Sequence, residues 1–584
     1  MQHPTPTSRQ RLRRLTGMHA MLLWAALAGL AGALATIAFR DGLAALQRLL
    51  VGHDGSFVDM AAALPWPVRI ALPCLGGVVA GAVLVWARRL PGTKPPDYME
   101  AITVGDGRVP IRQTLLRSLS SMCTIASGGS IGREGPMVQL AALCASLVGR
   151  AARFDPARLR LLAACGAAAG IASAYNAPIA SAFFITEIVL GTIAIDTLGP
   201  MMIAAVVANV TMRRFPGYRP VYEMPPFPDV ALFDVAWFAL LGILAGLLAP
   251  QFLRLLRLAT QGFQKTRLPA PLRLGLGGLG VGVISVWAPQ VWGNGYEVVN
   301  TLLHQNWLWS AVLAILLLKV AATLCTAGSG AVGGIFTPTL FVGAALGQLF
   351  GQAVHALWPA AAATTAAGAA YTIVGMGAFL AAATGAPLMA ILMIFEMTLS
   401  YQVMLPLMLA CVIAYFLARS MGGPSMYEIT ARHRRDEEAR TRLRATQMHE
   451  LIRPAETVLP LDAGMDEMLA MFGSHPVKYL YVVDADERYQ GVVALRDLAA
   501  QPPGAEAETE TRLARDVVRR DALPLVTPGM SLGEAARQFQ LHHGERLPAV
   551  KSEADPLLLG VVYKTALLDA FARLQPAEVP GLRS

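Results

Sequence analysis

Long apolar segments alternate with short polar connections over the first 430 residues, and the chain then becomes charged. Several apolar runs reach or approach the roughly 20 residues that a membrane-spanning helix needs. These runs are Leu22–Ala38, Ile70–Trp86, Val235–Ala249, Ala311–Leu324 and Met404–Leu417. Others are short and interrupted by glycine or proline, which is tolerated at membrane depth where helices line a cavity. The pattern predicts an all-α polytopic membrane protein that contains broken and half helices.

A glycine-rich loop occurs twice, about 200 residues apart. The first copy reads GSIGREGP and ends at Pro136, and the second reads GAVGGIFTP and ends at Pro338. We expect each proline to open an apolar helix, because proline suits the first helical position. The unpaired amides of a helix N-terminus attract anions. The two loops therefore predict an anion site within the membrane, and Glu134 places a carboxylate beside it.

The repeat extends beyond these loops. Gly166–Pro178 matches Gly375–Pro387, and the same offset pairs Glu187 with Glu396. Close packing of membrane helices favours glycine and alanine by itself, but it does not explain the aligned proline and glutamate. We therefore expect duplicated helical repeats, with halves at about 18–215 and 230–430. Fused transporter repeats often have opposite topology, so inverted repeats are expected here.

The C-terminal part has a different pattern. Residues 431–450 form a charged run, most simply a solvated helical linker, and two segments of alternating apolar runs and short amphipathic helices follow. The segments cover 451–500 and 514–575, and residues 576–584 form a tail. This second internal repeat resembles a tandem pair of CBS modules, so we expect a C-terminal cytoplasmic α/β tandem CBS domain.

Charge and cysteines set further limits. A basic arm, residues 1–17, precedes the first apolar run, and Arg432–Arg435 follow the last one, so both termini are predicted to be cytoplasmic. We interpret the first apolar run as a retained helix and not a signal peptide, because it is too long and many more follow. The net charge of +9 is not gathered into a nucleic-acid surface. The six cysteines lack Cys-x-x-Cys spacing and predict no disulfide framework or metal site.

Taken together, GSIGREGP, GGIFTP, the YNAP helix leading to Glu187 and the GAP helix leading to Glu396 resemble the ClC chloride channel and transporter family. The resemblance covers roughly residues 18–430. It implies a homodimer in the lipid bilayer with one chloride pore per subunit, and a multi-pass protein of the bacterial inner membrane. It also implies that an anion is bound by the backbone amides of Ile335 and Phe336, by hydroxyls of Thr93 and Tyr427, and by the first loop at Gly132, Arg133 and Gly135.

The family resemblance assigns the gate to Glu134. A carboxylate beside a helix N-terminus can occupy the place of the anion, and protonation removes its charge and lets the anion pass. The simpler alternative is a capping acid or a partner of Arg133. A buried acid in a membrane is usually functional, which favours the gate. Near Thr93 the chain reads GTKPP where the family usually has Gly-Ser-Gly-Ile-Pro, so selectivity among chloride, nitrate and other anions stays open.

One position bears on proton coupling. Antiporters of the family commonly carry two adjacent acids where this chain has Glu187 and then Ile188, and the second acid relays protons. The relay position therefore lacks its acid here. This favours passive chloride flux, with a proton-coupled antiporter as the alternative, because water can carry protons past a missing side chain. Glu396 is expected to be structural.

In the tail, Asp497 stands where nucleotide-binding CBS modules usually hold a ribose, whereas the second module has Lys564 at that point. Adenine nucleotide is therefore a weak candidate ligand, and no other cofactor is expected.

Two rival functions remain. A membrane protease needs His-Glu-x-x-His for zinc, and His449-Glu450-Leu451-Ile452-Arg453 lacks the second histidine. A divalent-cation transporter needs several acids around one cavity, and the membrane part offers only scattered ones. Neither an enzyme nor a cation carrier is therefore expected.

Overall fold

The computed structural model describes residues 8–52, 56–89, 97–215, 222, 234–305, 307–357, 368–423, 425–427, 448–499, 512–520, 522–541 and 544–574. The chain divides into two compact units, Met1–Ala431 and Arg432–Ser584. Each unit has its own buried apolar core.

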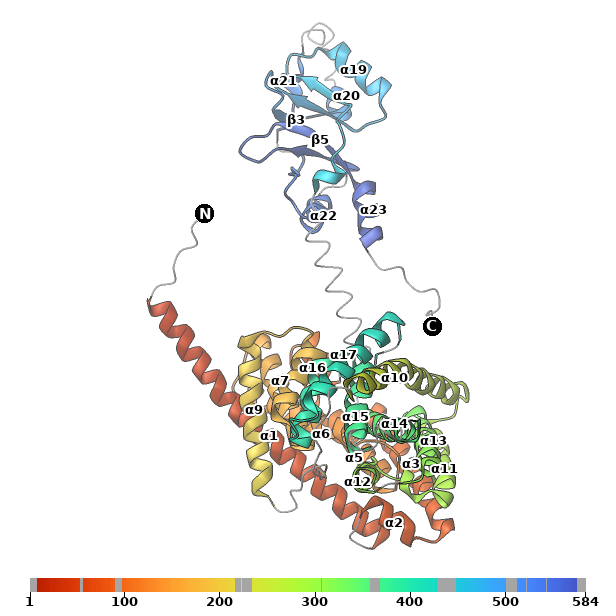
Figure 1. Ribbon diagram of the computed structural model, residues 1–584. Helices are drawn as coiled ribbons and strands as arrows, with labels where there is room; N and C mark the ends of the chain where they lie inside the picture. Colours follow the sequence, from red (N-terminus) through yellow and green to blue (C-terminus); the bar gives the residue numbers. More distant parts are fainter. Residues whose placement is uncertain are drawn as a thin grey trace. The chain divides into compact units, whose positions relative to one another are not determined.

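The first unit is helical throughout its described residues (Figure 1). Its first repeat contains α1 (Ser8–Val51), α2 (Phe57–Ala63), α3 (Trp66–Arg89), α4 (Tyr98–Thr103), α5 (Ile111–Ala126), α6 (Glu134–Ala151), α7 (Pro156–Tyr175), α8 (Pro178–Phe184), the π-helical turn η1 (Ile185–Leu190) and α9 (Ile195–Arg214). Its second repeat contains α10 (Asp234–Lys265), α11 (Ala270–Trp287), η2 (Pro289–Val291), α12 (Tyr296–His304), α13 (Trp309–Gly328), α14 (Phe336–Leu357), α15 (Gly368–Thr384), α16 (Pro387–Thr398) and α17 (Met404–Ser420).

Eight helices among the described residues are long and apolar enough to cross a membrane, judged by length and composition. They lie in α1, α3, α7, α9, α10, α11, α13 and α14. The segments Pro178–Leu190, Gly368–Thr384, Pro387–Thr398 and Met404–Ser420 are apolar but shorter. The prediction of a polytopic helical protein with half helices is therefore confirmed.

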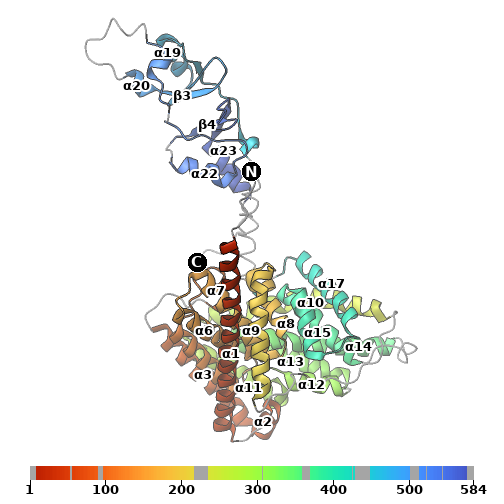
Figure 2. The same cartoon turned by 90° about the vertical axis from the view of Figure 1, so that its left-hand side faces the viewer.

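The short helix α15 lies inside this unit. Every residue of α15 from Ala370 to Thr384 is buried, as expected for a helix that is apolar all round. α15 lies beside α14 in both overall views, while α1 runs along α9 at the periphery (Figure 2). α15 is thus enclosed by neighbouring helices, among them the longer α10 and α14, which keeps it away from lipid.

Glycines set the closest helix contacts, at equivalent points of the two repeats. A Cβ added at Gly343 of α14 would lie 2.5 Å from the carbonyl oxygen of Gly375 of α15. A Cβ added at Gly166 of α7, the repeat equivalent of Gly375, would lie 2.6 Å from the carbonyl oxygen of Ala141 of α6. Both distances are too short for a real side chain, so each helix pair packs backbone against backbone.

The second unit is α/β. It contains η4 (Met448–Leu451), β1 (Val458–Pro460), α19 (Met465–Ser474), β2 (Tyr479–Val483), β3 (Tyr489–Ala494), α20 (Leu495–Ala499), α21 (Ala514–Val517), α22 (Leu532–Leu541), β4 (Arg546–Val550), β5 (Leu558–Tyr563) and α23 (Lys564–Leu574). β1 pairs parallel with β2, which pairs antiparallel with β3. β4 pairs antiparallel with β5, and Val526 forms a parallel bridge with Ala549 of β4.

The two halves of this unit therefore share one strand order, which is the internal repeat that the sequence predicts. They also exchange strand segments. Arg519, near the start of the second half, pairs with Val492 of β3, and Arg453, near the start of the first half, pairs with Val561 of β5. In the second half, the apolar run Leu525–Thr527 takes part in the sheet through the bridge at Val526. Most of the predicted charged linker, 431–447, lies outside the described residues, as do His542 and His543.

Candidate functional site

The two copies of the glycine-rich loop lie against each other. The Gly132 N–H donates to the Gly334 carbonyl at 2.8 Å, and the Gly334 N–H donates to the Gly132 carbonyl at 2.9 Å, as an antiparallel bridge. The repeat therefore brings the two expected anion loops to one place. The Gly132 amide is occupied by this bond, so Gly132 holds the loops together and its amide is not available to an anion in this structure.

The helices start slightly earlier than expected. α6 begins at Glu134 and α14 at Phe336, so Pro136 and Pro338 are third residues and not first ones. Proline is tolerated throughout the first turn of a helix, because the N–H groups of that turn have no intrahelical partner to lose. The first bond of α14 runs from the Thr339 N–H to the Ile335 carbonyl. The amides of Ile335 and Phe336 precede that bond, as an anion site needs.

A cavity of about 850 Å³ lies at these helix starts. Five of the residues expected at the anion site line it: Glu134, Gly135, Ile335, Phe336 and Tyr427. Arg133 is not among the lining residues. Thr93 lies outside the described residues, although Arg88 before it and Asp97 after it both line the cavity. The cavity thus joins elements from both repeats and from the end of the membrane unit.

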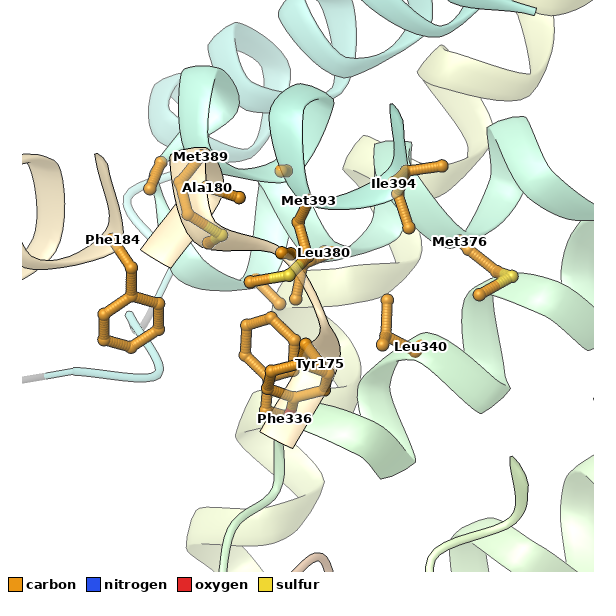
Figure 3. Packing of buried hydrophobic residues seen from close by; sticks show 14 of the residues in the cluster. Tyr175, Ala180, Phe184, Phe336, Leu340, Met376, Leu380, Met389, Met393 and Ile394 are labelled. Atoms are coloured by element: carbon orange, nitrogen blue, oxygen red, sulfur yellow. The ribbon is translucent and has the colours of Figure 1, made fainter. Parts of the chain in front are cut away.

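Aromatic rings form one wall of the cavity. Phe336 lies 5.0 Å from Tyr175 and 6.2 Å from Phe184 between ring centroids, and Phe184 meets Tyr427 edge to face at 5.6 Å. Tyr175, Phe184 and Phe336 lie together among buried methionines and leucines of the core (Figure 3). The ring of Phe336 is therefore packed on several sides, which fixes the start of α14.

Glu134 is the buried acid at the junction of the loops. Only 4% of its surface is exposed. Its Oε1 accepts a hydrogen bond from the Tyr296 hydroxyl at 3.0 Å, while its Oε2 is buried and has no partner among the described residues. A buried carboxylate oxygen without a partner is costly. Such a group in a membrane domain is usually kept for function.

The acids Glu187 and Glu396 do something different from Glu134. The Glu187 carboxylate accepts from the backbone N–H groups of Leu388 and Met389 at 3.3 and 2.7 Å. The Glu396 carboxylate accepts from those of Ile179 and Ala180 at 2.9 and 2.7 Å. Each glutamate thus holds the N–H groups of the second and third residues of a half helix in the other repeat.

This exchange follows from the sequence at the helix starts. The N-cap residues of α8 and α16 are Ala177 and Ala386, which carry no acceptor for the free amides. An acid from the other repeat supplies that acceptor and also complements the positive end of the helix dipole. Each repeat supplies a glutamate that caps the half helix of the other repeat. The two repeats are therefore related by an approximate two-fold axis. This is the relation expected of inverted repeats.

Loss of either capping acid should lower stability. We expect Glu187→Ala and Glu396→Ala each to cost about 2 kcal/mol, because each leaves two backbone amides without a charged acceptor. Thermal unfolding in detergent at a fixed scan rate measures the effect. Glu187→Gln and Glu396→Gln, which keep one acceptor oxygen, should lie between wild type and the alanine variants. Similar melting for Glu187→Ala and wild type would contradict the capping role.

Ile188 is buried in the core, with 2% of its surface exposed, and lies in the π-helical turn that continues α8. It does not line the cavity. The neighbouring Glu187 is engaged with α16, as described above. The structure therefore places an apolar side chain at the predicted relay position.

Asp497 lies in α20 of the second unit. Its Oδ1 accepts from the Arg519 guanidinium in an ion pair, and its Oδ2 is buried without a partner among the described residues. The side chain is 17% exposed. A basic residue from the strand exchange thus already contacts the carboxylate proposed for ribose, and nucleotide binding stays a prediction.

Three hydroxyls around Glu134 were missed from the sequence: Tyr175, Tyr296 and Thr337. Thr337 belongs to the recognised loop, and Tyr175 to the YNAP segment, but neither was assigned a role. Tyr296 follows Asn294-Gly295 at the start of an ordinary amphipathic helix, 162 residues from Glu134. No fixed spacing links it to the gate, so only the tertiary structure reveals it.

A protein-family model described as voltage gated chloride channel matches residues 75–419. The chain belongs to the voltage-gated chloride channel, or ClC, family. A Ralstonia nicotianae protein named as a ClcB-like chloride channel protein is 55% identical over 425 residues, which is 72% of this chain and 98% of the relative. The voltage-gated ClC-type chloride channel ClcB of Escherichia coli O9:H4 is 40% identical over 424 residues, 71% of this chain and 100% of the relative.

Solved structures of ClC proteins share the fold. A slow cyanobacterial Cl⁻/H⁺ antiporter superposes with a TM-score of 0.61 at 26% identity, over 71% of this chain and 97% of that one. A eukaryotic CLC transporter superposes with a TM-score of 0.57 at 18% identity, over 94% and 98%. The second match includes the C-terminal unit. This ClC chain is therefore a multi-pass membrane protein with a helical duplicated domain and a C-terminal α/β unit.

Proposed function

We propose that this ClC protein is a passive chloride channel whose pore is closed by Glu134. The observation that carries the proposal is the position of Glu134, which is buried at the junction of the two loops and lines the same cavity as Ile335, Phe336 and Tyr427. Backbone amides supply partial positive charge without a full cation, so an anion can bind and still leave. The ionised Glu134 carboxylate competes with chloride for that place.

Ile188 favours passive chloride flux over proton-coupled exchange. An apolar, buried side chain at the expected relay position offers no group that can take up a proton. The ClcB relatives named as chloride channels support the same view. A proton-coupled antiporter is the second candidate, and the cyanobacterial Cl⁻/H⁺ antiporter of similar fold supports it.

The proposal also covers assembly and location. By analogy with the family, the protein is a homodimer with one pore per subunit in the bacterial inner membrane, and both termini are cytoplasmic. The basic residues at the start of α1 and those that follow α17 in the sequence support this orientation.

Chloride efflux from loaded liposomes tests the substrate class. With valinomycin present to balance charge, reconstituted protein should release chloride much faster than protein-free vesicles. Uptake of Mg²⁺ should equal that of the empty vesicles, since helix N-termini repel a cation. Mg²⁺ uptake without chloride release would contradict the anion function.

A further inference from the structure

The hydroxyl of Tyr296 is the direct partner of Glu134. Tyr296 Oη donates a hydrogen bond of 3.0 Å to Glu134 Oε1. Within the described part of the chain, this is the hydrogen bond that the carboxylate accepts. Tyr296 is the first residue of α12 and belongs to the second repeat, while Glu134 is the first residue of α6 in the first. The contact therefore links the gate to the opposite half of the domain.

Behind Tyr296 the hydroxyls form a chain. Tyr296 Oη lies 3.3 Å from Thr337 Oγ1, which lies 3.4 Å from Tyr175 Oη. The single hydrogen of Tyr296 is used on Glu134, so Thr337 must donate to Tyr296, and Tyr175 must then donate to Thr337. All three hydrogens thus point toward the carboxylate. A protonated Glu134 also accepts this bond through its carbonyl oxygen, but an ionised carboxylate accepts it more strongly, so the arrangement stabilises the ionised form.

From this geometry we infer that Tyr296 is a positioning residue that latches the ionised Glu134 in the closed pore. The inference rests on the proposed gating role of Glu134 and adds the group that holds the gate. Opening then requires that Glu134 be protonated and that the bond to Tyr296 be broken. Thr337 and Tyr175 support the latch by orienting its hydroxyl, through contacts that are longer and therefore weaker.

Other charged and titratable groups surround Glu134. Arg133 precedes it on the same loop, Tyr175 faces it from α7, and Tyr222 and Tyr427 lie close enough to interact with its charge. Arg88, Asp97 and Arg117 line the same cavity. Among these groups, Tyr296 donates the hydrogen bond to the carboxylate. Removal of its hydroxyl oxygen therefore tests the latch separately from the surrounding charges.

Tyr296→Phe removes the oxygen and keeps the ring. Without the donor, the ionised carboxylate loses stabilisation relative to the protonated one, so the open pore should persist to higher pH. We expect the midpoint of the chloride flux against pH curve to rise by about one pH unit, since a hydrogen bond to a charged group corresponds to at least that shift. Thr337→Val should shift it in the same direction by less.

Tyr222→Phe is the matched control. Tyr222 packs edge to face on Tyr296 at 5.6 Å, is 2% exposed, and its hydroxyl has no hydrogen-bond partner among the described residues. Tyr222→Phe thus removes a tyrosine hydroxyl from the adjacent ring, and this hydroxyl makes no hydrogen bond to the carboxylate. Its midpoint should match wild type. In a Glu134→Gln background, Tyr296→Phe should not change the chloride flux at any pH, because position 134 then carries no ionised group for Tyr296 to hold.

The outcomes separate the latch from the gate. A wild-type midpoint for Tyr296→Phe overturns the latch. An equal shift in Tyr222→Phe also overturns it, because it would indicate packing and not the hydroxyl. If Glu134→Gln itself keeps a wild-type pH response, the gate has failed and not only its latch. Gel filtration of each variant before reconstitution verifies that the compared proteins are folded.

Discussion

Glu134→Gln should hold the pore open and remove the pH dependence of chloride flux. Glutamine fills the same space as glutamate but carries no charge. An ionised carboxylate about 4 Å from chloride repels it by about 4 kcal/mol at the effective dielectric near a protein surface. Removal of that repulsion should raise flux at pH 7.5 by about tenfold or more, since each 1.4 kcal/mol is worth a factor of ten.

The measurement is initial chloride efflux from liposomes between pH 4.5 and 8, with valinomycin present. Wild-type flux should rise toward acid pH, whereas the variant should give one high rate throughout. Glu396→Gln is the matched control, because it removes the same charge from a second buried acid that caps α8. A variant at Glu134 with unchanged flux and unchanged pH response would refute the gating role.

A chloride gradient should move no protons uphill through the wild-type protein. Coupled exchange needs a path along which a proton reaches the gate from the cytoplasm, and the expected acid of that path is replaced by the buried Ile188. Glu187, one residue earlier, is held by the amides of Leu388 and Met389. An inward chloride gradient should therefore leave the pH inside and outside the vesicles unchanged.

A pH electrode outside the vesicles records this result. Addition of a protonophore at the end should produce a prompt pH change, which shows that the vesicles are sealed and that a membrane potential exists. Proton movement against its gradient before that addition would establish the antiporter instead. Ile188→Glu then gives a second comparison, because it restores the acid that the antiporters of the family carry at this point.

The architecture was predictable from the sequence because membrane helices leave a strong local signal. Lipid cannot satisfy backbone groups, so spanning segments must be long, apolar and helical, and these features are visible in any short window of the chain. The apolar runs Leu22–Ala38 and Ile70–Trp86 indeed lie within α1 and α3. The aligned proline and glutamate positions revealed the duplication in the same way.

The roles of the acids were less predictable. Glu187 and Glu396 each follow a helix-opening proline, whereas Glu134 precedes Pro136, and this placement along the chain does not say what each carboxylate contacts. The structure shows Glu187 and Glu396 bound to backbone amides of the other repeat, whereas Glu134 has a buried oxygen without a partner among the described residues. Unpaired burial distinguishes the gate candidate from the two caps.

The sequence by itself determined the membrane class, the duplication, the C-terminal α/β unit and the family, because each depends on local pattern or on aligned motifs. The tertiary structure alone decided that the two loops pair through Gly132 and Gly334, that the repeats cap each other, and that Tyr296 holds Glu134. These contacts join residues that are 160 to 220 positions apart. A hydrogen bond across such a distance depends on how the helices pack, and no periodicity along the chain encodes it.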